Sequence, residues 1–137
     1  MADPFLPQEL LPIARVYGRL GPHRDHQWRP LPWEGNFSKV LMFDPSTGQA
    51  LELGKMAAGA AFPAHSHPCL QAQYLVSGRL RSAQGEVIEQ GTFNVIPAGQ
   101  LHGPFLALEE TISLKYFAAA PAYVLPDGSR FDYGVDK

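Results

Sequence analysis

Short apolar runs separated by turn residues make up most of the chain after about residue 36. The runs of strand length are Phe37–Phe43, Ala50–Met56, Gln71–Val76, Arg79–Ser82, Glu86–Glu89, Thr92–Ile96, Thr111–Phe117 and Tyr123–Leu125. Turn-forming segments such as 44–48 (Asp-Pro-Ser-Thr-Gly) and 97–99 (Pro-Ala-Gly) follow them. Because sustained 3.6-residue periodicity is scarce, the pattern predicts an all-β antiparallel sandwich or barrel of about eight or nine strands.

The first 35 residues have a different pattern. Prolines at positions 4, 7, 12, 22, 30 and 32 are incompatible with a continuous strand there. We therefore expect an N-terminal proline-rich arm over residues 1–35 and a single barrel over residues 36–137. The arm is expected to wrap part of the barrel or to reach a partner subunit. His23 and His26 lie in this arm and are not expected to bind metal.

Three of the five histidines are spaced so that a β-fold could bring them together. His65 and His67 are two residues apart, and residues i and i+2 of a strand point to the same face. If the strand stays regular, that face continues through Cys69, Gln71 and Gln73. His102 follows its own glycine- and proline-marked turn, from which a meander could return it beside the first pair. An inward-facing glutamine needs a hydrogen-bond or metal partner, which makes Gln71 a candidate ligand.

Two blocks of residues resemble the two sequence motifs of the cupin superfamily. The first block is Gly59, His65, His67, Gln71 and Gly78, and the second is Gly91, Pro97, Gly99 and His102. The chain departs from the motifs at Gln71, where a Glu is usual, and at Leu106, where an Asn is frequent. The resemblance implies a single cupin (jelly-roll) barrel that holds one divalent transition metal on His65, His67 and His102. Gln71 is then the fourth ligand or, alternatively, a pocket residue that orients a histidine.

Segments 28–31, 39–48, 74–78, 110–114 and 127–128 are similar to small single-domain cupins of the 2,4'-dihydroxyacetophenone dioxygenase type and to acetylacetone-cleaving dioxygenases. Segment 68–73 departs from the sequence expected of those enzymes. The resemblance implies an Fe(II)-dependent dioxygenase that cleaves a C–C bond in a small hydroxyketone or β-diketone. Imidazole ligands also suit zinc, nickel and manganese. Three neutral imidazoles and an amide would leave the metal charge uncompensated, which favours an anionic or enolate ligand.

An apolar pocket wall is expected around this site. Its candidate residues, each of which could instead be ordinary core, are Phe62, Leu70, Tyr74, Phe93, Val95, Leu114 and Tyr116. Cys69 is expected to be a small buried hydrophobe, with a thiolate ligand as the alternative.

Two other functions remain open at this point. Similar cupin domains occur in anti-sigma regulators, where a non-catalytic barrel holds a metal and senses a signal. Residues 1–35 are too short and too rich in proline to form the helical module of those regulators. The second alternative is an isomerase acting on a sugar or keto acid. No cluster of Arg and Lys for a phosphate lies near the motifs.

Composition narrows the class of protein. Apolar residues make up 45% of the chain and charged residues 18%, as in an ordered globular domain. The net charge of −2, with no basic run, excludes a nucleic-acid partner. The chain contains no apolar stretch of ~18 residues, so no membrane-spanning helix is predicted. The single cysteine excludes an intrachain disulfide, and the N-terminus does not resemble a signal peptide, so a cytoplasmic location is expected. Exposed sheet edges favour a homodimer.

Overall fold

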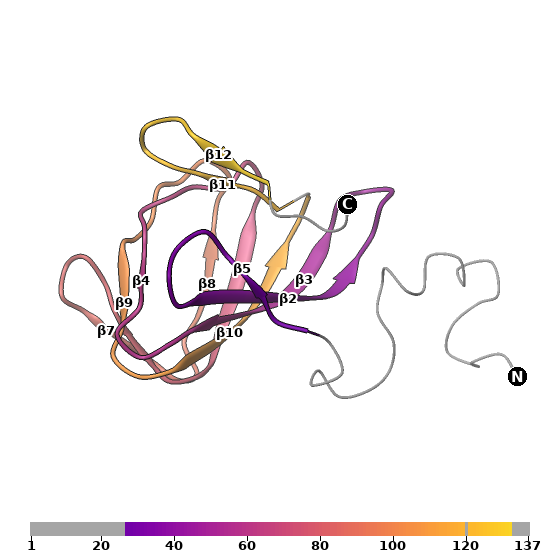
Figure 1. Cartoon of the computed structure of the whole chain (residues 1–137). Coiled ribbons are helices and arrows are strands. Elements are labelled where there is room, and N and C mark those ends of the chain that lie inside the picture. Colours follow the sequence, from indigo (N-terminus) through magenta and orange to yellow (C-terminus); the bar gives the residue numbers. More distant parts are fainter. Residues whose placement is uncertain (1–26, 120, 133–137) are drawn as a thin grey trace, which may run out of the picture.

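The computed structural model describes residues 27–119 and 121–132, and the regular elements in these ranges are all β-strands (Figure 1). The strands are β1 (Arg29–Pro30), β2 (Asn36–Phe43), β3 (Ala50–Met56), β4 (Ala61–Phe62), β5 (Gln71–Ser77), β6 (Arg79–Arg81), β7 (Val87–Glu89), β8 (Phe93–Ile96), β9 (Phe105–Ala107), β10 (Thr111–Phe117), β11 (Tyr123–Val124) and β12 (Arg130–Phe131). The all-β prediction is therefore confirmed. No helix in the described ranges is long and apolar enough to cross a membrane.

Two antiparallel sheets form the walls of the barrel. The larger has six strands in the order β1-β2-β3-β10-β5-β8, and the smaller has four in the order β4-β9-β6-β7. The β11–β12 hairpin, drawn in yellow, crosses one end of the barrel in Figure 1. A cavity of about 120 Å³ lies between the walls and receives side chains from both sheets.

The six-stranded sheet is polar on its inner face. Its cavity-lining side chains include Asn36, Ser38, Glu52, Gln71, Gln73, Asn94, Thr111, Ser113 and Lys115. Because side chains alternate between faces along a strand, the intervening positions point outward. These outward positions include Leu51, Ala72, Tyr74, Val76, Phe93, Val95, Ile112, Leu114 and Tyr116. Over these positions the usual arrangement, apolar inside and polar outside, is reversed, although Met56 and Leu75 of this sheet also line the cavity.

The four-stranded sheet has the usual arrangement. Phe62, Leu80, Ile88 and Phe105 line the cavity. The alternate positions in β6 and β7 are exposed and include Arg79, Arg81 and Glu89. Arg79 also forms an exposed ion pair with Glu109 at 3.0 Å.

An aromatic cluster closes one end of the cavity. Phe62 and the fully buried Tyr123 form its centre, and Trp33, Phe105 and Phe131 pack against them. The Trp33 ring lies 5.0 Å from the Phe62 ring and meets the Tyr123 ring edge-on at 5.4 Å. Burying one such side chain contributes on the order of 1.5–3 kcal/mol, so this cluster is a main source of stability near the cavity.

The predicted 1–35 arm is described only from residue 27. Within that part, β1 pairs with β2 through Arg29 and Ser38, so residues 29–30 belong to the six-stranded sheet. Pro30 is tolerated because β1 is an edge strand. The expected wrapping of the arm, with His23 and His26, falls on residues outside the described ranges.

Gly78 illustrates why glycine stands at the hairpin corners. It joins β5 to β6 with φ of 93°, a conformation that other residues rarely adopt. A Cβ atom there would also lie 2.7 Å from the Thr111 Cα atom. The corner therefore requires glycine both for its backbone conformation and for space.

Candidate metal centre

His65, His67 and His102 meet at one end of the cavity. One ring nitrogen from each lies within 4.8 Å of the other two, which makes them a group that could hold a metal ion. Their ring centroids are 4.2 to 5.2 Å apart. His65 and His67 are buried and His102 is partly buried.

The backbone brings the two sequence motifs together. His65 and His102 form an antiparallel bridge in which each backbone N–H donates to the other's carbonyl at 2.9 Å. This bridge continues the pairing of β4 with β9 beyond Phe62 and Phe105. The Gly99 N–H donates to the His67 carbonyl at 2.8 Å, which attaches the second motif to the first at another point.

Each imidazole has a backbone carbonyl beside its Nδ1 atom. The distances are 2.7 Å from His65 to Pro63, 2.7 Å from His67 to Ala122 and 3.1 Å from His102 to Gln100. A carbonyl oxygen only accepts, so Nδ1 carries the proton in each ring. Nε2 then keeps its lone pair, which is the tautomer that a metal-binding histidine needs.

Two buried atoms in this region have no hydrogen-bond partner among the described residues. They are Nε2 of His67 and Oε1 of Gln71. Leaving a buried acceptor unsatisfied costs about 1–3 kcal/mol, so such atoms are uncommon in folded proteins. A divalent transition metal would satisfy both kinds of atom, and the residues present therefore fit the ion that the resemblance implies.

The imidazoles are neutral at ordinary pH. Burial lowers the pKa of His65 to about 2, and the neighbouring His102 adds to this effect. Burial likewise lowers the pKa of His67 to about 3 and lowers that of His102. Since only the neutral imidazole coordinates a metal, these shifts keep all three rings competent for binding well below pH 7.

Gln71 is at the start of β5, on the six-stranded sheet. Its side chain is 1% exposed and lines the cavity that His65 and His102 also line. Burial alternates from His65 through His67 and Cys69 to Gln71, although the chain bends at residues 68–69 and the regular strand begins only at residue 71. The predicted common face therefore persists through the bend.

Comparison with family models decides the family. The model of the ChrR cupin-like domain matches residues 20–120, which is well over half of the chain. The chain belongs to the ChrR cupin-like family. The predicted cupin fold is thereby confirmed. Comparison with curated proteins found no match.

Solved cupin structures of several kinds resemble this cupin. Acetylacetone dioxygenase from Acinetobacter johnsonii superposes with a TM-score of 0.62 at 19% identity, covering 74% of each chain. The polyketide cyclase RemF from Streptomyces resistomycificus has a TM-score of 0.65 at 15% identity and 87% coverage of each chain. An RmlC-like cupin from Shewanella frigidimarina has a TM-score of 0.63 at 18% identity, covering 73% of this chain and 89% of that one. At these identities the likeness establishes the fold.

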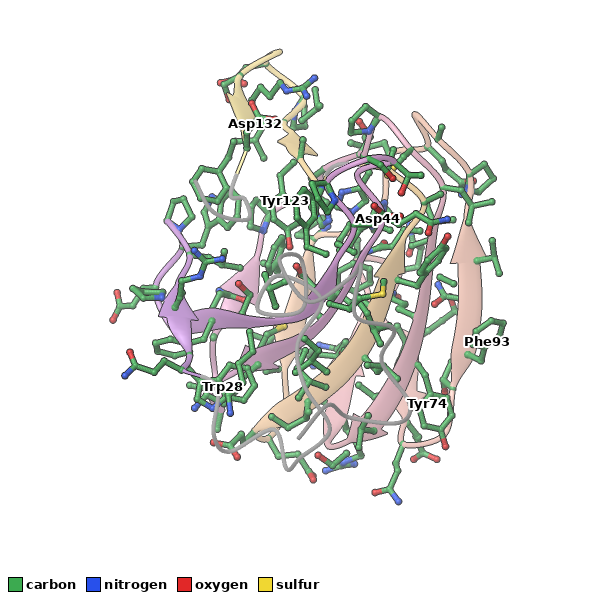
Figure 2. The ribbon with its side chains drawn as sticks, turned by 90° about the vertical axis from the view of Figure 1, so that its right-hand side faces the viewer. Trp28, Asp44, Tyr74, Phe93, Tyr123 and Asp132 are labelled. Atoms are coloured by element: carbon green, nitrogen blue, oxygen red, sulfur yellow. The ribbon has the colours of Figure 1, made fainter. Side chains whose placement is uncertain are left out.

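The predicted pocket wall is only partly correct. Phe62 lines the cavity of this cupin, but Tyr74, Phe93 and Tyr116 do not. Tyr74 is 43% exposed and Phe93 62% exposed, and Figure 2 shows both at the periphery of the molecule. Tyr116 also lies on the outer face, where its hydroxyl accepts a hydrogen bond from Gln49. The prediction failed because apolar strand positions were taken as inward, whereas this sheet has its apolar face outside.

The other three wall candidates also lie outside the cavity lining, whereas Cys69 is buried in the hydrophobic core. Leu70, Val95 and Leu114 are absent from the cavity lining. Cys69 is buried against Ala50 and Phe117, as expected of a small hydrophobe, and its Sγ lies 3.6 Å from the Ala119 carbonyl oxygen. It is not part of the histidine cluster.

Tyr123 and Lys115 belong to the site but were not anticipated from the sequence. The Tyr123 ring lies 5.0 Å from the rings of both His65 and His67, and Figure 2 places it within the fold. Lys115 lines the cavity, and its positive charge lowers the pKa of each of the three histidines. A tyrosine two residues after Pro121 and a lysine within an apolar strand gave no sequence signal for these roles.

Proposed function

We propose that this cupin is a metal-dependent dioxygenase that cleaves a C–C bond in a small carbonyl compound. The observation that carries the proposal is the cluster of three histidine ring nitrogens at a cavity between two sheets. The acetylacetone dioxygenase among its structural neighbours supports this choice of reaction. In such a reaction the C–C bond beside a carbonyl breaks, and each of the two separated carbons receives one oxygen atom from dioxygen.

His65, His67 and His102 would hold the metal, with Fe(II) favoured and Gln71 as fourth ligand through its amide oxygen. A bound Fe(II) supplies Lewis acidity toward the carbonyl oxygens and the electrons for dioxygen chemistry. Zinc, nickel and manganese are alternatives, because imidazole ligands suit each of them.

The protein itself contributes rigidity and exclusion of water. The Pro63, Ala122 and Gln100 carbonyls hold the three rings in one tautomer and orientation. The side chains of Phe62, Phe105 and Tyr123 surround one side of the cavity and limit water there. The substrate oxygens would then face the histidines with the carbon skeleton against this aromatic side.

The test is anaerobic purification, elemental analysis and oxygen uptake with a panel of β-diketones and hydroxyketones. We expect about one iron per chain and substrate-dependent oxygen consumption. His67→Ala should lose both, whereas His26→Ala, which removes a histidine from the predicted arm, should lose neither. Iron retained in a His65→Ala, His67→Ala, His102→Ala triple variant would overturn the metal site. Iron bound without oxygen uptake on any substrate would overturn the reaction.

A second candidate is a non-catalytic cupin that holds a metal and senses a signal. The match to the ChrR cupin-like domain favours it, since this is the family that the chain belongs to. It predicts stoichiometric metal, such as zinc, with no turnover on the same panel. The oxygen-uptake measurement therefore separates the two candidates.

A further inference from the structure

Four polar side chains form a row across the inner face of the six-stranded sheet. Glu52 on β3 is directly opposite Lys115 on β10, and Lys115 is opposite Gln73 on β5. Gln73 is in turn opposite Asn94 on β8. All four line the cavity. Because directly opposed residues have Cβ atoms about 4.5–5.5 Å apart on one face, the four make a continuous polar band.

Lys115 occupies the centre of this band. Its Nζ atom lies 5.4 Å from the centroid of Phe62, whose ring is 4.8 Å from that of His65. A Cβ atom at Gly54 would lie 3.2 Å from the same Nζ, so glycine keeps the space beside the ammonium open. Among the described residues no hydrogen bond engages this ammonium, and its three donors remain for a ligand.

The charges around Lys115 make it a receptor for an anion. Burial lowers the pKa of Lys115, while the negative charge of Glu52 raises it and so supports the ammonium form. A buried cation in a cavity wall is costly unless an anion accompanies it. Gln73 and Asn94, on the side of Lys115 away from Glu52, add amide N–H donors. An incoming anion would approach on that side, where no carboxylate repels it.

We propose that the row Glu52–Lys115–Gln73–Asn94 is a carboxylate-binding subsite, and that the ligand of this cupin is a small oxo- or hydroxy-carboxylate. Its carboxylate binds Lys115, Gln73 and Asn94, and its second oxygen function faces the histidine cluster. This inference deepens the proposed function and rests on it for the second half of that statement. The role of Glu52 is to hold the charge of Lys115.

The dimensions suit such a ligand. Gln71 and Gln73 point to the same face two residues apart on β5, which is about 7 Å along the strand. That separation corresponds to a chain of a few carbons between the metal-facing oxygen and the carboxylate. A neutral diketone would fill the cavity but leave the polar band without a partner.

The test compares two probes that differ by one carboxylate, 2,4-dioxopentanoate and pentane-2,4-dione. Calorimetric titration into the zinc-loaded protein measures binding without oxygen chemistry. We expect the acid to bind about 10- to 100-fold more tightly, as for one charge-assisted hydrogen-bonded contact. Lys115→Met should abolish this preference. The matched control, Lys39→Met, removes a cation on β2 that does not line the cavity and whose Nζ lies 4.6 Å from the Trp28 ring centroid, and it should retain the preference.

Either of two results would overturn the subsite: equal affinity of the two probes for the wild-type protein, or an acid preference that survives in folded Lys115→Met. If that variant does not fold, the methyl ester of 2,4-dioxopentanoate is titrated into the wild-type protein instead. The ester lacks the carboxylate charge, so it should bind more weakly than the acid by the same factor of about 10- to 100-fold. Failure of the dioxygenase proposal is separate. Tight binding of the acid without oxygen uptake by the iron-loaded protein would overturn the dioxygenase proposal but would still support the carboxylate subsite.

Discussion

The two sheets of this cupin divide their residues between inside and outside in opposite ways. The four-stranded sheet places Phe62, Leu80, Ile88 and Phe105 toward the cavity and exposes charged side chains such as Arg81 and Glu89. The six-stranded sheet places amides, hydroxyls and the Glu52–Lys115 pair toward the cavity. The inner face of the first wall is therefore mainly apolar, whereas the second wall combines a polar inner band with buried apolar residues such as Leu75, Ile96 and Phe117.

The histidine cluster lies at the boundary between these walls. His65 and His102 extend the β4–β9 pairing of the apolar wall, and Gln71 begins β5 of the polar wall. A ligand held at the cluster would touch an aromatic surface on one side and a polar surface on the other. This two-sided environment is what orients an amphipathic small molecule.

The largest expected effect is acid destabilisation of the metal-free protein, which acts at that boundary. Unfolded histidines titrate near pH 6.5, whereas burial holds the pKa values of His65 and His67 at about 2 and about 3. The unfolded state therefore binds more protons below pH 6.5, and stability falls as pH drops through the window from 6.5 toward 3. Two such groups cost on the order of 5 kcal/mol between pH 6.5 and pH 4.5.

Urea unfolding of the chelated protein at the two pH values measures this loss. The control is a His65→Gln, His67→Gln double variant, which keeps the carboxylates that also titrate. Its free energy of unfolding should fall much less between the two pH values. Equal pH dependence in both proteins would mean that the buried rings do not govern acid stability.

The second expected effect compares the walls directly. Phe62→Ala removes the side chain that contacts Trp33, His65 and Tyr123, and should reduce the free energy of unfolding by about 3–5 kcal/mol. Gln73→Ala, on the polar wall, should cost no more than about 1 kcal/mol. Chemical denaturation of both variants checks the difference. Similar losses for the two would contradict the difference between the two inner faces.

The third effect concerns Gln71, a polar-wall residue that lines the same cavity as His65 and His102. If Gln71 is a ligand, Gln71→Ala should weaken metal affinity by about 10- to 100-fold, and Gln71→Glu should retain or strengthen it. Competition with a chromogenic chelator gives the affinities, and Gln73→Ala serves as the matched control. Unchanged affinity in Gln71→Ala would assign this residue to orienting a histidine or the substrate.

The sequence predicted the strands better than it predicted their faces. Ala50–Met56 and Thr111–Phe117 were predicted to the residue, because turn residues bound them on both sides. Strands β1, β4, β9 and β12 were missed, since runs of two or three residues leave too little pattern. The histidine cluster was predicted from the spacing of the histidines together with the resemblance to the two cupin motifs. Lys115 was not, because its role depends on Glu52, Gln73 and Phe62 from three other strands.

The smallest expected effect on stability comes from the outer face of the polar wall, which carries the expected homodimer contact. Strand β8 is an edge of the six-stranded sheet, and Phe93 and Val95 on it are 62% and 50% exposed beside Tyr74. Apolar side chains on an open edge favour pairing with a second copy. Phe93→Lys should convert a dimer into a monomer in light scattering and change the free energy of unfolding of the monomer by less than about 0.5 kcal/mol. Gln84→Lys, in the exposed turn between β6 and β7, should leave the dimer intact. A Phe93→Lys protein that remains dimeric would show that the outward apolar face is covered in some other way, and the reversed sheet would then need a different explanation.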